Sequence, residues 1–223
     1  MSARIDVGRG SAREAIRTQT AKPLRRDAEL NLARILLAAQ EVFGEHGYEA
    51  SMEQVAARAG VGVGTLYRRF PTKADLCTAV VEAATDRTCQ IAREVLAEVA
   101  PGDAVSEFAR RCMDAPSSWR AATSKRLWSG AGADRALDAL MPLIWPLLEA
   151  SQRAGTIRSD IVPTDLVVTL MSVRAISDIC DADAPGASRR FLHIALDGLR
   201  PEHKTPDQLP MSVKQLGRVL TER

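Results

Sequence analysis

Apolar residues recur at steps of three and four positions along most of the chain, which is the spacing of helices that bury one face. The first such stretch begins at Asp27 and carries Leu32, Ile35, Leu36, Ala39, Val42 and Phe43. We expect this helix to end at His46 and Gly47, because glycine readily adopts the left-handed conformation that follows a helix C-terminus. Residues 1–26 lack the periodicity, contain two glycines and a proline, and are predicted to be a flexible basic arm.

Two short helices are predicted next. Ser51 has a glutamine three positions later, which is the pattern of a capping box and predicts a helix that begins there. The glycine-containing run over 60–62 ends it. A third helix over 63–70 then places Leu66 and Phe70 on one face, because they are four positions apart. Two short helices joined by a turn with glycine are typical of a helix-turn-helix.

The rest of the chain predicts longer helices. Thr72 and Asp75 repeat the capping pattern and open a helix that continues to about Val99. Further helices are expected over residues 103–115, 119–130, 134–154, 164–181, 187–199 and 212–221. Pro142 and Pro146 fall inside one of these segments and are expected to kink the helix or delay its start. The prediction is an all-α chain of about nine helices.

Composition supports this assignment. Aromatic residues make up 4% of the 223 residues while alanine is abundant, which favours closely packed helices over a β-sandwich. No apolar run approaches the ~18 residues of a membrane span, and the N-terminus lacks the apolar core of a secretory signal. We therefore expect a cytoplasmic protein with no membrane partner. The four cysteines lack zinc-site spacing and are expected to be reduced core residues, so no metal or other cofactor is predicted.

Charge is unevenly distributed. The formal net charge is +2, and residues 1–75 carry 12 basic and 9 acidic side chains while residues 76–223 carry 18 and 19. The basic excess therefore lies in the N-terminal third. It permits a nucleic-acid partner without requiring one, because phosphate binding needs only a local cluster of cations.

The third predicted helix presents a surface suited to duplex DNA. Burial of Leu66 and Phe70 leaves its tip and flanks to Val63, Gly64, Thr65, Tyr67, Arg68 and Arg69. Such a helix fits the major groove, which is ~12 Å wide, while the capped helix starts at Ser51 and Thr72 and the charge of Lys73 suit phosphates. Each feature also has a plainer interpretation, since an arginine pair often forms a solvated face and a tyrosine often only packs.

These residues also carry a resemblance to a known family. Its motifs are matched at residues 43–48, 54–56, 59–73 and Leu76. The run from Gly64 to Lys73 is the most specific, and the segment resembles the N-terminal domain of the TetR family of bacterial transcriptional repressors. The resemblance covers about residues 30–78, while residues 189–201 are similar to a subgroup common in actinobacteria. It implies an all-helical homodimer whose first three helices bind operator DNA and whose C-terminal domain binds a small molecule and pairs the subunits.

By position, the resemblance assigns DNA-binding roles to individual residues. The phosphate-facing start of the second helix is formed by Ser51 and Met52. The base-reading surface is formed by Val63, Gly64, Thr65 and Arg68. The residues on or near the DNA backbone are Tyr67, Arg69 and Lys73. The basic arm is longer than the family's shortest members need, and it either adds contacts to DNA or is disordered.

The remaining predictions concern domains, effector and dimer. The predicted domains are the arm over 1–26, a helix-turn-helix domain over 27–74, a ligand-binding and dimerisation domain over 75–200 and a proline-containing tail over 201–223. The candidates for an apolar effector cavity are Phe108, Met113, Trp119, Trp128, Met141 and Trp145, each of which also fits an ordinary core position. The arginines that suit an anionic ligand or surface ion pairs are Arg120, Arg126 and Arg174. The predicted dimer surface contains Leu166, Leu170, Val173, Phe191, Leu192 and Ala195.

The predicted function is a ligand-responsive transcriptional regulator. It is expected to be a repressor that binds a palindromic operator in double-stranded DNA as a homodimer and is released by a small apolar effector. An enzyme is disfavoured, because the sequence contains no GxxxxGK[ST] loop, no GxSxG and no HExxH motif. The alternative is a constitutive or architectural helix-turn-helix protein without a ligand.

Overall fold

The computed structural model describes residues 30–114, 131–180, 183–202 and 208–221, and every regular element in these ranges is a helix. The elements are a helix over 30–46, η1 (Gly47–Glu49), α2 (Met52–Ala59), α3 (Val63–Arg69), α4 (Lys73–Glu98), η2 (Pro101–Asp103), α5 (Ala104–Asp114), α7 (Ala131–Arg153), α8 (Pro163–Cys180), α9 (Ala187–Asp197) and α10 (Val213–Thr221). This confirms the predicted all-α class. The basic arm and the helix expected over 119–130 lie outside the described residues.

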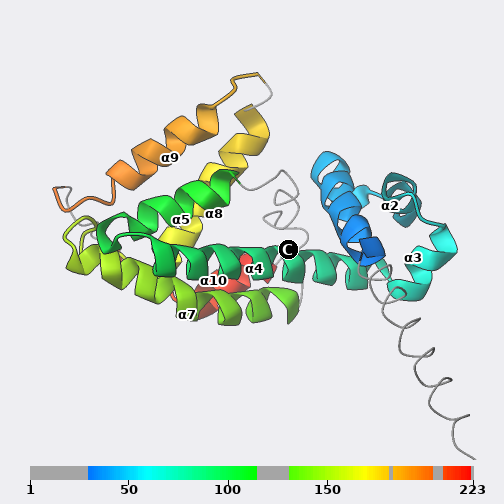
Figure 1. Ribbon diagram of the computed structural model, residues 1–223, viewed down its shortest axis with the longest axis horizontal. Helices are drawn as coiled ribbons and strands as arrows, with labels where there is room; N and C mark the ends of the chain where they lie inside the picture. Colours follow the sequence, from blue (N-terminus) through cyan, green and yellow to red (C-terminus); the bar gives the residue numbers. More distant parts are fainter. Residues whose placement is uncertain (1–29, 115–130, 181–182, 203–207, 222–223) are drawn as a thin grey trace, which may run out of the picture.

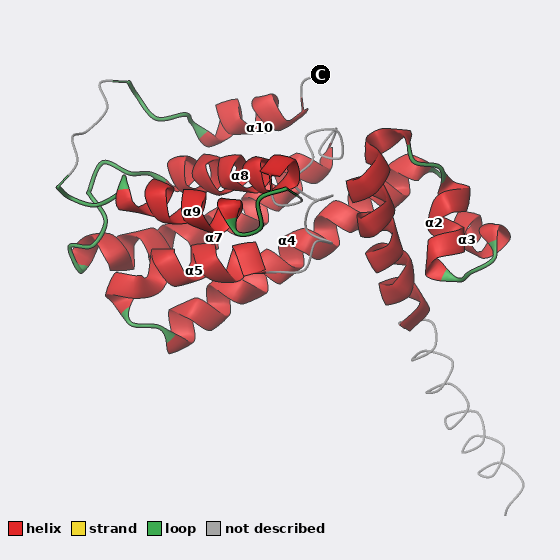
Figure 2. Cartoon of the chain, turned by 90° about the horizontal axis from the view of Figure 1, so that it is seen from above, coloured by secondary structure: helices red, strands yellow, loops and turns green. Residues whose placement is uncertain are grey.

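The helices form two groups joined by α4. The 30–46 helix, α2 and α3 gather at one end of α4, while α5 and α7 pack along the rest of it and α8 and α9 pack against those two helices and each other (Figures 1 and 2). With 26 residues, α4 is about 39 Å long. No helix in the described ranges has the length and apolarity needed to cross a membrane.

The helix caps are those that the sequence predicts. In the first capping box the Ser51 hydroxyl accepts from the Gln54 backbone N–H at 3.2 Å, and the Ser51 N–H donates to the Gln54 side chain at 2.7 Å. Thr72 and Asp75 form the second box at the start of α4. Gly60 ends α2 with a φ of 65°, in the left-handed region. These local contacts set where α2 and α4 begin and where the turn before α3 lies.

The core consists mainly of two apolar clusters that share α4. The first holds the 30–46 helix, α2, α3 and the start of α4, and it extends to Leu137 of α7 and Leu216 of α10. The second surrounds Phe108 between α4, α5, α7 and α8. Side chains of α4 therefore pack in both clusters.

Of the two effects expected of the α7 prolines, the delayed start is wrong. Its helix begins at Ala131, three residues before the expected start, and continues through Pro142 and Pro146. Each proline leaves the carbonyl four residues earlier without its helical hydrogen bond. Those carbonyls belong to residue 138 and to Pro142, both exposed, so water can satisfy them while Leu147 and other buried neighbours hold the helix in place.

The cysteines are free thiols, as expected. Cys77, Cys89 and Cys112 are buried and Cys180 is half-buried. Burial raises the pKa of Cys77 to about 11, against a partly opposing effect of the nearby Lys73 charge. These buried thiols therefore act as small apolar core residues.

Candidate nucleic-acid interface and effector region

One face of α3 is buried against the core and the other is exposed to solvent. Leu66 is fully buried, and Phe70, which caps the C-terminus of the helix, is buried too. The exposed side is formed by Val63, Gly64, Tyr67, Arg68 and Arg69, with Thr65 half-buried beside them. Tyr67 keeps 42% of its surface exposed although it is aromatic. The structure thus brings the predicted base-facing and backbone-facing residues of α3 onto one accessible surface.

The start of α2 differs in part from the sequence-based picture. Ser51 is half-buried and its hydroxyl is engaged in the capping box. The Met52 side chain is 5% exposed and packs in the N-terminal core. At this position only the Met52 backbone is available to a phosphate, which suits the first N–H groups of a helix.

A carboxylate that the sequence interpretation did not single out lies between α2 and α3. The Tyr67 hydroxyl donates to Glu53 Oε1 at 3.5 Å, and Glu53 is exposed. The pKa of Glu53 is lowered by its own backbone N–H, by the Ser51 hydroxyl and by Tyr67. Glu53 could have been noticed in the sequence as an isolated acidic residue in an otherwise neutral and basic stretch.

Two cations lie at the corner between α3 and α4. The Arg69 guanidinium lies 5.7 Å from the centre of the Phe70 ring, and Lys73 Nζ lies 6.0 Å from the centre of the Phe43 ring. Each cation thus lies close to an aromatic ring of the N-terminal core. Both are among the residues that the resemblance assigns to the DNA backbone.

The turn between α2 and α3 is braced by the first helix. Arg34 donates to the Ala59 carbonyl at 2.9 Å. Arg58 pairs with Glu41 at 3.0 Å and Glu45 at 2.8 Å, and these carboxylates raise the Arg58 pKa. These contacts orient the helix-turn-helix against the 30–46 helix.

The described effector candidates are scattered over the larger bundle. Phe108 is 1% exposed in the second core cluster, and Met141 is half-buried where the two clusters adjoin. Trp145 is 56% exposed on α7. Met113 lines a hollow of about 200 Å³ between α5 and α9. The structure does not bring these four around one described cavity, and Trp119 and Trp128 lie outside the described residues.

A larger groove of about 1190 Å³ runs between α5 and α9 and reaches the end of α4. Its walls combine apolar residues such as Ile157, Leu192 and Ile194 with a set of polar ones: Glu98, Asp103, Glu107, Arg110, His193, Asp197 and Arg200. This groove was not among the features predicted from the sequence. Its signal was the three- and four-residue spacing of polar positions on both helices, which by itself equally fits a solvated surface.

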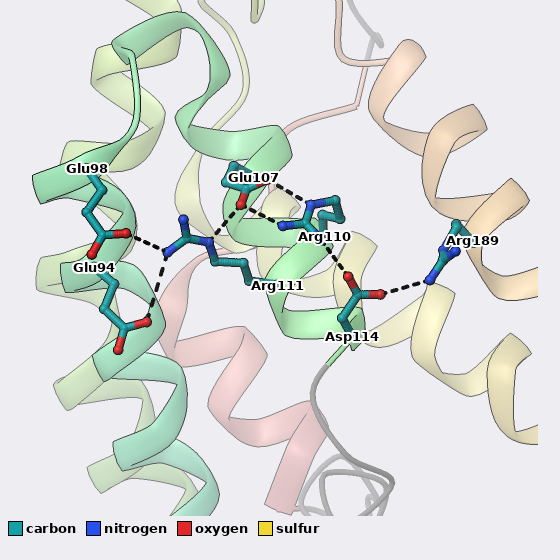
Figure 3. A network of polar contacts seen from close by, with 7 residues as sticks. All are labelled: Glu94, Glu98, Glu107, Arg110, Arg111, Asp114 and Arg189. Carbon is teal, nitrogen blue, oxygen red and sulfur yellow. Dashed lines mark hydrogen bonds and ion pairs between the residues drawn. The ribbon is translucent and has the colours of Figure 1, made fainter.

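An ion-pair network crosses this region and joins α5 to α4 and α9 (Figure 3). Arg111 contacts Glu107 at 2.7 Å and Glu98 of α4 at 3.2 Å. Arg110 contacts Glu107 at 2.7 Å and Asp114 at 2.6 Å. The two arginines hold the pKa of Glu107 at about 2. Glu107 is therefore charged at any pH near neutrality.

The network continues from α5 to α9 and further along α4. Asp114 pairs with Arg189 of α9 at 3.1 Å, and Arg111 also lies 4.0 Å from Glu94 of α4. Three helices are thus joined by charged contacts at the surface, above the apolar contacts that join them in the core. Through these ion pairs α9 is linked, by way of α5, to α4, the helix that directly follows α3 in the chain.

The predicted dimer residues divide into two sets. Leu166, Val173 and Leu192 are buried in the chain's own core, and Leu170 and Ala195 are half-buried. Phe191 is 42% exposed on α9, and on the same side of that helix Ile194 is 55% exposed. In the described part of α8, Val168 is another exposed apolar residue. The apolar surface left on α9 therefore centres on Phe191 and Ile194.

Comparison with known families identifies two matching segments. Residues 35–80 match the family described as bacterial regulatory proteins, tetR family. Residues 100–201 match the family described as transcriptional regulator SbtR-like, C-terminal domain. The second match covers a part of the chain where the residues alone carried little resemblance.

Solved structures and curated relatives agree with these matches. A TetR transcription regulatory protein from Mycobacterium vanbaalenii is 34% identical, with a TM-score of 0.59, over 80% of this chain and 99% of that one. A TetR transcriptional regulator from Streptomyces coelicolor is 35% identical, with a TM-score of 0.57, over 76% and 98%. An HTH-type transcriptional regulator from Staphylococcus aureus (strain USA300) is 44% identical over 64 residues, 28% of this chain. The chain thus covers 35% of the length of that curated relative.

Proposed function

The chain belongs to the TetR family of transcriptional regulators, and we propose that it is a ligand-responsive repressor that binds a palindromic operator as a homodimer. The observation that carries the proposal is the geometry of α3. Leu66 and Phe70 hold this short helix by one side, while the other side offers a glycine, a threonine, a tyrosine and two arginines. A helix held in this way can enter a major groove with its N-terminus leading.

The proposed contacts divide into base readout and backbone positioning. The residues proposed to meet base edges are Val63, Gly64, Thr65 and Arg68. Those proposed to meet phosphates are Ser51, the Met52 backbone, Tyr67, Arg69 and Lys73. Apolar groups suit thymine methyls and a guanidinium suits guanine, while N–H groups, hydroxyls and cations suit phosphates. This division follows the chemistry of each exposed group on the α2–α3 surface.

The proposed dimer forms through α8 and α9. Phe191 and Ile194 supply exposed apolar surface on α9, and a second copy would cover it. A two-fold axis beside these helices presents two copies of α3 to one face of DNA. Half-sites one turn apart require the two helices to lie about 34 Å from each other.

The proposed effector acts through α4. Its candidate contacts are Phe108, Met113, Trp119, Trp128, Met141 and Trp145. A ligand among the helices of the larger bundle displaces α4, which is packed in both core clusters and begins at Lys73 beside α3. The two copies of α3 then no longer match the half-site spacing. Reciprocity requires operator DNA to weaken ligand binding by the same factor.

The division into units follows the same scheme. We propose a DNA-binding unit over 27–74 and an effector and dimer unit over 75–200, preceded by the arm over 1–26. In the tail over 201–223, α10 buries Leu216 and Leu220 in the first core cluster. Family membership favours a ligand-responsive regulator over a DNA-binding protein without a ligand.

Alanine substitution on α3 tests the DNA-binding role. Arg68→Ala should lower the affinity for a duplex selected from a random library by about ten-fold, because a paired guanidinium is lost. Arg153→Ala, which removes an exposed arginine from α7, is the matched control and should stay within about two-fold. Fluorescence anisotropy of the labelled duplex measures both. Equal affinities for Arg68→Ala and the unaltered protein would contradict the proposed orientation of α3.

A further inference from the structure

One carboxylate lies within the surface proposed to face DNA. Glu53 is the only acidic residue between Ala50 and Ala74 of the sequence, and four cations occupy the same stretch. It is the second residue of α2 and is exposed. Its Oε1 accepts the hydroxyl of Tyr67 from α3, at 3.5 Å. A negative charge is therefore held where the proposed function places DNA phosphates.

The donors around this carboxylate are of the kind that hold phosphates. The Tyr67 hydroxyl donates to it at 3.5 Å, and Glu53 lies in the first turn of α2, where backbone N–H groups have no acceptor within the helix. Proteins use helix N-termini and hydroxyl groups to bind DNA phosphates. Two anions on one set of donors repel each other, so a phosphate can use these groups only by displacing the carboxylate.

We propose that Glu53 limits the affinity of this protein for DNA, because its carboxylate competes with a DNA phosphate for the Tyr67 hydroxyl at the start of α2. This inference rests on the proposed DNA-binding function of the α2–α3 surface. Phosphates occur in every duplex, so the competition weakens binding whatever the base sequence. It shortens the time that the regulator is held on the non-operator DNA that greatly outnumbers its operator.

The opposite role for Glu53 makes the opposite prediction. A carboxylate that served only to orient the Tyr67 hydroxyl toward DNA would strengthen binding, and its removal would weaken it. The sign of the change in affinity separates the two roles.

The test is Glu53→Gln, which keeps the shape of the side chain and an oxygen that can accept from Tyr67 while removing the charge. Anisotropy of a labelled duplex of random sequence should show affinity rising about five-fold at moderate salt, because one like-charge contact with a phosphate is lost. The slope of log affinity against log salt should become steeper. Asp86→Asn makes the same change in net charge at an exposed site about 20 Å along α4 from Lys73 and should stay within about two-fold.

The same substitution in a Tyr67→Phe protein tests whether the effect depends on the Tyr67 hydroxyl. In Tyr67→Phe one donor is absent, so the gain from Glu53→Gln should be smaller than in the unaltered protein. Affinity that is unchanged or lower in Glu53→Gln, with the melting temperature preserved, would overturn the inference and leave the proposed function in place. Failure of the unaltered protein to bind any duplex would instead overturn the proposed function, and the inference with it.

Discussion

Two glycines of the helix-turn-helix differ in whether their position can accept a side chain. Gly60 has a φ of 65°, and a Cβ there would lie 2.9 Å from Arg34 Nη2. Gly64 lies within α3, where a Cβ would meet nothing within 4 Å. Gly60→Ala should therefore lower the free energy of unfolding by about 1–2 kcal/mol, because alanine is strained at positive φ. Denaturant unfolding followed by circular dichroism measures this change.

Gly64→Ala is the control for that effect and carries its own expectation. Alanine in a helix should raise the free energy of unfolding by about 0.5–1 kcal/mol. It should nevertheless reduce operator affinity by about ten-fold, because a methyl group would intrude where the α3 backbone approaches the bases. A stabilised variant with full affinity would show that α3 does not approach DNA with this side.

Among residues, those with local roles could be predicted from the sequence. The capping by Ser51 and Thr72 and the turn at Gly60 follow from residues within a few positions, and the structure confirms them. The burial of Met52 and the pairing of Glu53 with Tyr67 depend on how α2 meets the neighbouring helices. No spacing of residues in the sequence specifies how α2 packs against those helices.

At the level of elements, the network on α5 predicts a response to acid. The pKa of Glu107 is held at about 2, below its ordinary value of 4.5, by hydrogen bonds from Arg110 and Arg111. A lowered carboxyl pKa stabilises the folded state above pH 4.5, and this contribution is lost as the pH falls from 4.5 toward 2. The melting temperature of the unaltered protein should therefore fall more steeply across this range than that of Glu107→Gln.

Differential scanning calorimetry over a pH series measures this difference. Glu149→Gln is the matched control, since Glu149 lies in an exposed pair with Arg153 at 3.7 Å and should leave the pH dependence unchanged. Parallel curves for Glu107→Gln and the unaltered protein would mean that the network adds nothing to stability.

The helices themselves were largely predictable, because apolar periodicity and capping residues are repeated in each. The prolines of α7 show how far such local signals predict a helix. Pro142 and Pro146 indicated a kink or a later start, and the later start is wrong, because the helix begins at Ala131 and includes both prolines. Packing of its buried side, for example at Ile144 and Leu147, outweighs the lost hydrogen bonds. That balance depends on neighbouring helices and is absent from the local sequence.

The whole molecule is proposed to act as a dimer, and the exposed face of α9 provides the test. Ile194→Asp places a charge on a residue that is 55% exposed in the single chain. If a second copy covers this face, the variant should be a folded monomer and should lose at least about ten-fold in operator affinity, because burying an unpaired charge opposes assembly. Sedimentation velocity measures the mass, and anisotropy measures the affinity.

Val219→Asp is the corresponding control. Val219 is an exposed apolar residue on α10, and a charge there should change neither mass nor affinity. An Ile194→Asp variant that stays dimeric would place the subunit contact elsewhere. A dimer that dissociates in both variants would indicate a general effect of added charge.

The sequence by itself determined the helical class, the order and approximate bounds of the helices and the helix-turn-helix, since periodicity, caps and turns depend on neighbours within a few positions. The tertiary structure alone decided which sides of those helices meet. It buried Leu192 within the chain and left Phe191 exposed, joined α4, α5 and α9 by ion pairs, and set Glu53 beside Tyr67. These features pair residues far apart in the chain, and their contacts exist only once the helices have packed.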